Sequence, residues 1–311
     1  MRNSSFAAKE SRHVRVNSGK RLASLWKEIR PQQWTKNLFV VAPLLFSQNL
    51  FSLVAVERAF VAFVSFCLMS SSIYLFNDLK DLEQDRLHPK KRFRPLAAGD
   101  ISGIAAWTLM TLLVLSSLTI GAILSPLFAL ALATYWLINS LYSAVLKHLV
   151  ILDAFAVASG FLLRVIGGGV AIDVEVSHWI LLCTSLVALF LAFTKRRHEL
   201  GLLKLEAIAH RRVLKDYNVQ FLDMMIGIVT AATVMSYALY TASDDTVQRF
   251  HTRGLLLTVP FVLYGIFRYL YLVYQKEDGG DPTESLLTDR PMLINLFLWA
   301  VTTAVVVYRV Y

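Results

Sequence analysis

Apolar residues run along most of the chain in stretches about as long as a membrane is thick. The stretches lie at roughly 38–56, 59–79, 104–124, 127–146, 149–172, 178–197, 219–242, 254–274 and 292–309. An α-helix needs about 20 apolar residues to span the hydrocarbon core of a bilayer. The pattern therefore predicts an all-α, polytopic membrane protein with nine transmembrane helices in residues 38–311. The first stretch is the least regular, because it carries Pro43, Gln48 and Asn49.

The first 37 residues are polar and basic, unlike the rest of the chain. They contain no early apolar core followed by a small-residue cleavage site, so we expect no cleavable signal peptide. We predict that residues 1–37 form a cytoplasmic N-terminal tail that continues into an interfacial helix near Leu22–Ile29.

The composition agrees with a membrane protein and excludes an ordinary soluble domain. Hydrophobic residues make up 56% of the chain, and the mean hydropathy is +0.54. The net charge of +9 would suggest nucleic-acid binding in a soluble protein. Here the charge lies in loops, where membrane topology explains it, so we expect no nucleic-acid partner. Cys67 and Cys183 lie in separate apolar stretches and are too few for a disulfide framework or a zinc site.

Lysine and arginine in the loops predict the orientation. With the N-terminus inside, the inner segments hold 25 of these residues and the outer segments hold four. Cytoplasmic loops carry such an excess of positive charge. We therefore predict a multi-pass membrane protein with the N-terminus in the cytoplasm and, after an odd number of spans, the C-terminus outside.

The segment Asn77–Asp85 closes the second apolar stretch with three aspartates. In a continuous helix, Asp78, Asp81 and Asp85 share one face, and Asn77 joins it. Carboxylates this close repel one another unless a cation lies between them, and oxygen ligands suit Mg2+. We predict that Asn77, Asp78, Asp81 and Asp85 bind Mg2+. The alternative is a solvated acidic helix end.

Basic residues follow the aspartates directly and favour a site for a diphosphate over a solvated helix end. They are Arg86, Lys90, Lys91, Arg92 and Arg94. Arginine and lysine beside a metal cluster are the groups that a diphosphate requires, and we assign Lys91 and Arg94 to that role. Positive-inside topology alone also accounts for basic residues here.

Other candidate substrate contacts come from three further segments. Lys36 and Asn37 begin the first span on the side of the aspartates, and Tyr142 and Lys147 end the fourth on that side. Arg164 lies mid-helix and must face a cavity or a partner, which is either a phosphate or a carboxylate.

Asp153 lies about one turn into the fifth span, where an ionisable side chain indicates function. We predict that it completes the metal site from a second pair of helices. The basic run Lys195–Glu199 lies at a cytoplasmic helix end, and we interpret it mainly as a topology signal.

Taken with the nine predicted spans, the motif N-D-x-x-D-x-x-x-D at Asn77–Asp85 resembles the UbiA superfamily of intramembrane prenyltransferases. Four further motifs are similar to the decaprenyl-phosphate phosphoribosyltransferase branch. They are R-P-x-Q-W-x-K-N at Arg30–Asn37, Y-S-x-x-L-K at Tyr142–Lys147, S-G-F-x-x-R at Ser159–Arg164 and K-R-R-x-E-L at Lys195–Leu200. The resemblance implies a UbiA-like bundle in the bacterial inner (plasma) membrane, with an active-site cavity that faces the cytoplasm.

This resemblance also implies an activity. Members of the branch transfer 5-phosphoribose from phosphoribosyl diphosphate (PRPP) to a polyprenyl phosphate, decaprenyl phosphate, for cell-envelope arabinan precursors. Asp78, Asp81, Asp85 and Asp153 are then the catalytic candidates, with Mg2+ as cofactor. Prenyl-transferring members usually carry a second D-x-x-x-D motif, but Val157 follows four residues after Asp153 here. This departure favours PRPP over a prenyl diphosphate.

Two alternatives remain open at this stage. One is a UbiA-type polyprenyltransferase that acts on an aromatic acceptor. The other is a membrane transporter, in which Asp153, Arg164 and Arg268 mark a path through the bilayer. Against a transporter, the acidic cluster lies at the cytoplasmic mouth, and paired broken helices at mid-membrane are not evident. The lipid bilayer is the expected surroundings in each case, and a homo-oligomer is compatible with all of them.

Overall fold

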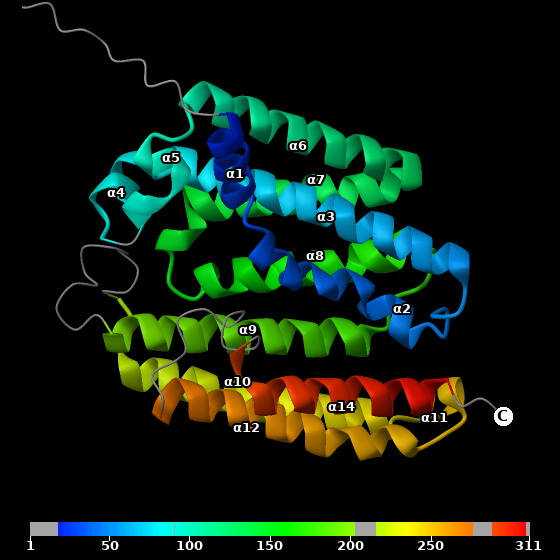
Figure 1. Cartoon of the computed structure of the whole chain (residues 1–311). Coiled ribbons are helices and arrows are strands. Elements are labelled where there is room, and N and C mark those ends of the chain that lie inside the picture. The colour runs from blue at the N-terminus through cyan, green and yellow to red at the C-terminus, as the bar shows by residue number, and fades with distance from the viewer. Residues whose placement is uncertain (1–17, 90, 203–215, 276–287, 309–311) are drawn as a thin grey trace, which may run out of the picture.

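The computed structural model describes residues 18–89, 91–202, 216–275 and 288–308, and all regular structure in them is helical (Figure 1). The expected all-α class is therefore confirmed. The long helices lie side by side along one direction, with α4 and α5 at one end of the bundle and α2 and α11 at the other (Figure 1). The helices are α1 (Ser18–Glu28), η1 (Pro31–Val41), α2 (Ala42–Phe46), α3 (Leu53–Lys80), α4 (Leu82–Leu87), η2 (Lys91–Phe93), α5 (Pro95–Ala98), α6 (Gly103–Leu124), α7 (Pro126–Ala144), η3 (Leu146–His148), α8 (Leu152–Ala171), α9 (His178–Leu202), α10 (Val219–Ala242), α11 (Asp244–Phe250), η6 (Gly254–Thr258), α12 (Val259–Gln275) and α14 (Arg290–Val307).

Eight helices within the described ranges are long and apolar enough to cross a membrane. They are α3, α6, α7, α8, α9, α10, the continuous η6–α12 segment and α14. Their outward faces are apolar, as Ile104 and Ile123 of α6 illustrate, since both are strongly exposed. Exposed apolar surface on this scale is stable only against lipid.

The predicted first span, residues 38–56, is not a continuous α-helix, so the ninth transmembrane helix is not confirmed. The chain forms a 3₁₀-helix, η1, and then the short helix α2. Pro31 and Pro43 occupy the first turns of these two elements, where a missing N–H is tolerated. A 3₁₀-helix rises about 2.0 Å per residue, so η1 and α2 together measure roughly 30 Å. Figure 1 shows this segment running along α3 and α8.

Glycine in α8 makes the close approach of η1 possible. A Cβ at Gly168 would lie 1.9 Å from the carbonyl oxygen of Val40. Any other residue at this position would push η1 away from α8. Gly168 therefore sets how closely η1 packs against α8.

The N-terminal segment contains a helix where one was predicted, and its place at the membrane interface stays a prediction. Helix α1 covers the expected interfacial helix near Leu22–Ile29, and it packs against α5 and the end of α3. Residues 1–17 of the predicted tail, and Lys90 in the basic loop, lie outside the described residues. The side of the membrane on which each terminus lies stays a prediction.

Candidate functional site

The three aspartates of the Asn77–Asp85 segment lie at a break between two helices. Helix α3 ends at Lys80, Asp81 adopts φ −94° and ψ 11°, and α4 begins at Leu82. Hydrogen bonds of helical spacing still join Asp81 N–H to Asn77 and Asp85 N–H to Asp81, at 2.9 and 2.8 Å. The aspartates therefore stay near one another although the helix is not continuous.

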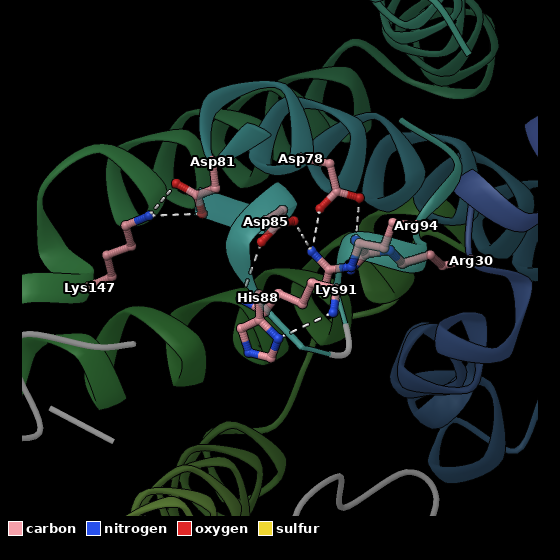
Figure 2. A network of polar contacts seen from close by, with 8 residues as sticks. All are labelled: Arg30, Asp78, Asp81, Asp85, His88, Lys91, Arg94 and Lys147. Carbon is pink, nitrogen blue, oxygen red and sulfur yellow. Dashed lines mark hydrogen bonds and ion pairs between the residues drawn. The ribbon is translucent and has the colours of Figure 1, made fainter. Parts of the chain in front are cut away.

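Asp78 and Asp85 are buried and share one arginine. Their exposed fractions are only 4% and 2%. Arg94 Nη1 donates to Asp78 Oδ1 at 2.9 Å and to Asp85 Oδ2 at 2.5 Å, so one cationic nitrogen bridges the two carboxylates (Figure 2). Arg30 forms an ion pair with the other oxygen of Asp78. Two buried carboxylates are stable side by side because these guanidinium groups lie between and beside them.

Two lysines complete the charge pairing at this end of the bundle. Lys91 Nζ lies 3.6 Å from Asp85 Oδ1. Lys147, in the η3 turn after α7, donates to Asp81 Oδ1 at 3.0 Å and to Oδ2 at 3.2 Å (Figure 2). The structure thus brings Lys91, Arg94 and Lys147, three of the predicted substrate contacts, to the aspartates.

Arg30 was not predicted as a site residue, although it is the first residue of the motif Arg30–Asn37. The residue adopts φ 54° and ψ 61°, a left-handed conformation that is uncommon for arginine. This turn between α1 and η1 directs its side chain toward α3, where the guanidinium lies 5.0 Å from the Tyr74 ring centre and pairs with Asp78. Its position before Pro31 on the side of the aspartates was the only available signal.

The donor set fits a divalent cation such as Mg2+. No three His, Cys, Asp or Glu side chains of the described segments converge closely enough to form a metal cluster. Arg94 Nη1 instead takes the position between Asp78 and Asp85 that a cation requires. The buried Oδ1 of Asn77 has no hydrogen-bond partner among the described residues. Carboxylate and amide oxygens are the ligands that Mg2+ prefers.

Glu28 of α1 is a further acidic group at this site that the sequence did not point to. It is only 1% exposed, and neither carboxylate oxygen has a hydrogen-bond partner in the described part of the chain. Burial, followed by the neighbouring Asp78 carboxylate, raises the pKa of Glu28 to about 7. A glutamate six residues into an expected interfacial helix gave no sequence signal of burial.

We expect Glu28→Gln to stabilise the protein at pH 8 but not at pH 4.5. Because the pKa of Glu28 is higher in the folded state than in the unfolded state, the free energy of unfolding falls as the pH rises from about 4.5 to 7. Over this range the carboxyl group ionises in the unfolded state first, which favours unfolding. A neutral glutamine removes this loss, which is on the order of 1–3 kcal/mol. Thermal unfolding in EDTA at both pH values measures the difference. Glu83→Gln is the control, because Glu83 is 83% exposed; equal melting temperatures of wild type and Glu28→Gln at pH 8 would contradict the prediction.

Asn37 and Arg164, two other predicted substrate contacts, meet each other in the core. Arg164 Nε donates to Asn37 Oδ1 at 2.7 Å, and Arg164 Nη2 donates to Tyr135 Oη at 2.6 Å. Asn37 Nδ2 donates to Ser70 Oγ at 3.1 Å. The described partners of Arg164 are all neutral, so this network joins η1, α3, α7 and α8 without a carboxylate. Lys36 lies half-buried on η1.

Asp153 forms a second buried centre with partners of its own. Its side chain is fully buried, and its oxygens accept from Arg196 Nε at 2.7 Å and from Tyr217 Oη at 2.8 Å. Arg196 Nη2 also donates to Tyr142 Oη at 3.3 Å. Arg196 belongs to the basic run that we interpreted as a topology signal, yet it is 2% exposed. The role of Asp153 as a metal ligand stays a prediction.

Comparison with known proteins gives concordant results. The profile of the UbiA prenyltransferase family matches residues 38–301. The "Decaprenyl-phosphate phosphoribosyltransferase" of Mycolicibacterium smegmatis is 37% identical over 302 residues, which cover 92% of this chain and 93% of that protein. The protein of the same name from Mycobacterium tuberculosis is 33% identical, and the match covers 92% of this chain and 95% of that protein.

Solved structures show the same fold. A UbiA homologue from Archaeoglobus fulgidus, bound to GPP and Mg2+, superposes with a TM-score of 0.70 at 19% sequence identity. The match covers 92% of this chain and 99% of that one. The helical bundle, the aspartates at one of its ends and the family match agree with one another. The chain therefore belongs to the UbiA prenyltransferase family and is a membrane-embedded transferase of that family.

Proposed function

We propose that the chain transfers 5-phosphoribose from PRPP to a polyprenyl phosphate, decaprenyl phosphate, in an Mg2+-dependent reaction that releases diphosphate. The observation that carries the proposal is the bridge from Asp78 through Arg94 to Asp85, beside Arg30, Lys91 and Lys147. Acidic groups that suit a metal ion are thus in direct contact with cations that suit phosphate. The names of the curated relatives support the same activity. The product would serve the synthesis of cell-envelope arabinan precursors.

PRPP has two anionic groups, and the site residues divide between them. Asn77, Asp78, Asp81 and Asp85 would hold Mg2+, which when bound neutralises charge on the leaving diphosphate. Lys91 and Arg94 bind the same diphosphate through charge-assisted hydrogen bonds. The 5-phosphate is bound by a further cation, for which Lys147, beside Asp81, is the best-placed candidate, with Lys36 and Arg164 as alternatives. Asn37, which accepts from Arg164, and Tyr142, which accepts from Arg196, are the remaining candidate contacts to the substrate.

The reaction needs no strong base. An oxygen of the polyprenyl phosphate is already anionic, so it attacks ribose C1 directly. The bond from C1 to the diphosphate oxygen breaks, and its electron pair leaves with the diphosphate. Positive charge develops at C1 in the transition state, and the nearby aspartates stabilise it electrostatically. Displacement in one step inverts the configuration at C1.

The decisive experiment incubates purified protein with PRPP labelled in the ribose, Mg2+ and decaprenyl phosphate. We expect a labelled lipid product and an equal amount of diphosphate, with neither formed in EDTA. A parallel reaction offers a polyprenyl diphosphate and an aromatic acid. If label from PRPP stays water-soluble while the aromatic acid is prenylated, the phosphoribosyl assignment is wrong. Movement of unchanged PRPP across proteoliposomes would instead indicate a transporter.

Lys147→Met tests the division of roles between the cations. We expect an apparent KM for PRPP about 10- to 100-fold above wild type, because a charge-assisted phosphate contact contributes about 1.5–3 kcal/mol. The Mg2+ dependence should persist, since Lys147 is not a metal ligand. Arg86→Met is the control, as Arg86 forms an exposed pair with Glu83. An unchanged KM in Lys147→Met would remove Lys147 from the PRPP site.

A further inference from the structure

The chain makes a strained turn between η3 and α8, close to Lys147. Ile151 has φ 69° and ψ −49°, and Leu152 N–H donates to Val150 O at 2.8 Å. This is the geometry of a γ-turn with positive φ, which is rare and strained. Positive φ is especially unfavourable for a β-branched residue such as isoleucine. Some other contact must therefore hold Ile151 in this conformation.

Tyr217 supplies that contact. Its hydroxyl accepts the Ile151 N–H at 2.7 Å and donates to Asp153 Oδ1 at 2.8 Å. Asp153 in turn accepts from Arg196 at its other oxygen. Tyr217, Asp153 and Arg196 are all buried, so water does not compete for these bonds. The tyrosine hydroxyl is the link between a strained backbone amide and a buried ion pair.

The same cluster anchors the segment of Lys147 on both sides. Arg196 donates to Tyr142 Oη, five residues before Lys147, and Tyr217 holds Ile151, four residues after it. Between these anchors the chain is closed by short backbone bonds, from His148 to Val145 and from Leu149 to Leu146, each 3.0 Å. A segment this short and this well bonded transmits a shift at Ile151 to Lys147. Figure 2 shows the Lys147 ammonium meeting Asp81.

We infer that Tyr217 is a positioning residue for the reaction: by holding the Ile151 turn it places Lys147 beside Asp81 for contact with the phosphate of the substrate. This inference rests on the proposed function for its kinetic consequence. Tyr217 touches neither the aspartates of α3–α4 nor Lys147 in the contacts described above. The effect of Tyr217 on Lys147 passes through the backbone of the η3 turn. The separation of these two residues along the sequence does not reveal this connection.

Tyr217→Phe tests the inference, because it removes only the hydroxyl. We expect KM for PRPP to rise about tenfold, the equivalent of one lost hydrogen bond, while kcat changes little. Tyr274→Phe is the matched control: Tyr274 also donates to an aspartate, Asp223, at 2.6 Å, but its polar contacts in the described part of the chain are with Asp223 and Arg197 rather than with the η3 turn. Equal kinetics of the two variants would overturn the inference.

A double-mutant cycle separates positioning from a general loss of structure. Glycine adopts positive φ without strain, so Ile151→Gly should keep the turn without help from Tyr217. In the Ile151→Gly background, Tyr217→Phe should change KM by less than about threefold. Two fully additive effects would show that Tyr217 acts elsewhere.

Hydrogen exchange gives a readout that requires no substrate. Peptides covering residues 145–153 should exchange faster in Tyr217→Phe than in wild type or Tyr274→Phe, and Ile151→Gly should reduce that difference. Unchanged exchange in Tyr217→Phe would overturn the inference whatever the kinetics show. If the wild-type protein does not use PRPP but the exchange result holds, the proposed function fails while the structural role of Tyr217 stands.

Discussion

Asp81→Asn is expected to lower the rate of phosphoribosyl transfer by about 10³-fold or more, equivalent to roughly 4 kcal/mol of lost transition-state stabilisation. Asp81 lies at the break between α3 and α4 and pairs with Lys147. It is only partly buried, so its replacement should leave folding intact. Turnover of labelled PRPP, with the melting temperature measured in parallel, distinguishes lost chemistry from lost structure.

Glu83→Gln provides the comparison for Asp81→Asn. Glu83 lies in the same short segment, but its carboxylate is exposed and pairs only with Arg86 among the contacts described. It should retain nearly full activity. Asp78→Ala is expected to abolish turnover too. Because Asp78 is buried with Arg30 and Arg94, the melting temperature of this variant must be measured to distinguish lost chemistry from unfolding. Full activity of Asp81→Asn in metal-free buffer would end the proposal of a metal-dependent diphosphate site.

Arg94→Met should have the second largest effect. Part of this effect is a change in the melting temperature, which can be measured without substrate. Removing the guanidinium leaves Asp78 and Asp85 close together and buried, with only Arg30 and Lys91 to offset their charge. Unpairing buried carboxylates costs about 1–3 kcal/mol or more, so the melting temperature in EDTA should fall. A divalent cation can replace the lost charge, so Mg2+ should raise the melting temperature of Arg94→Met more than that of wild type.

Activity provides the second measurement on Arg94→Met. We expect kcat/KM for PRPP to fall about 100-fold, because the variant lacks a contact to the diphosphate. Arg92→Met is the control, since Arg92 is exposed and its guanidinium lies over the Phe93 ring rather than beside an aspartate. If Mg2+ stabilises wild type and Arg94→Met equally, the position bridged by Arg94 is not the metal position.

Short-range features of the site followed from the sequence. Helical spacing brought Asp78 and Asp85 to one arginine, Arg94, even though the helix breaks at Asp81, whose own side chain pairs with Lys147. The basic residues of the following loop were correctly expected near the aspartates, because only a few residues separate Asp85 from Lys91 and Arg94. The helical class and eight of the spans also followed, since membrane thickness sets helix length.

Long-range partners did not follow from the sequence. Lys147 was selected as a phosphate contact, but its pairing with Asp81, 66 residues away, was not expected. Asp153 was expected beside the other aspartates, whereas the structure pairs it with Arg196 and Tyr217. Arg30 and Glu28 were not selected at all, because their burial depends on how α1 lies against α3 and α5.

The first span shows the same limit for backbone structure. An apolar stretch predicts a crossing, but it does not distinguish an α-helix from the narrower 3₁₀ form that η1 adopts. The η1 segment packs closely on α8 at Val40 and Gly168, which are 128 residues apart along the chain. Local propensity does not contain such information.

Hydrophobic pattern determined the length and approximate ends of most of the long helices, and charge determined where a polar site could lie. Only the tertiary structure decided which faces of the helices meet. In a soluble helix the polar face marks the outside, but here Ile104 faces lipid and Phe66 is buried, although both are apolar. Lipid tails are as apolar as a protein core, so hydrophobicity does not fix helix rotation. Packing of small residues and pairing of buried charges fix it instead, and those contacts form only when distant segments come together.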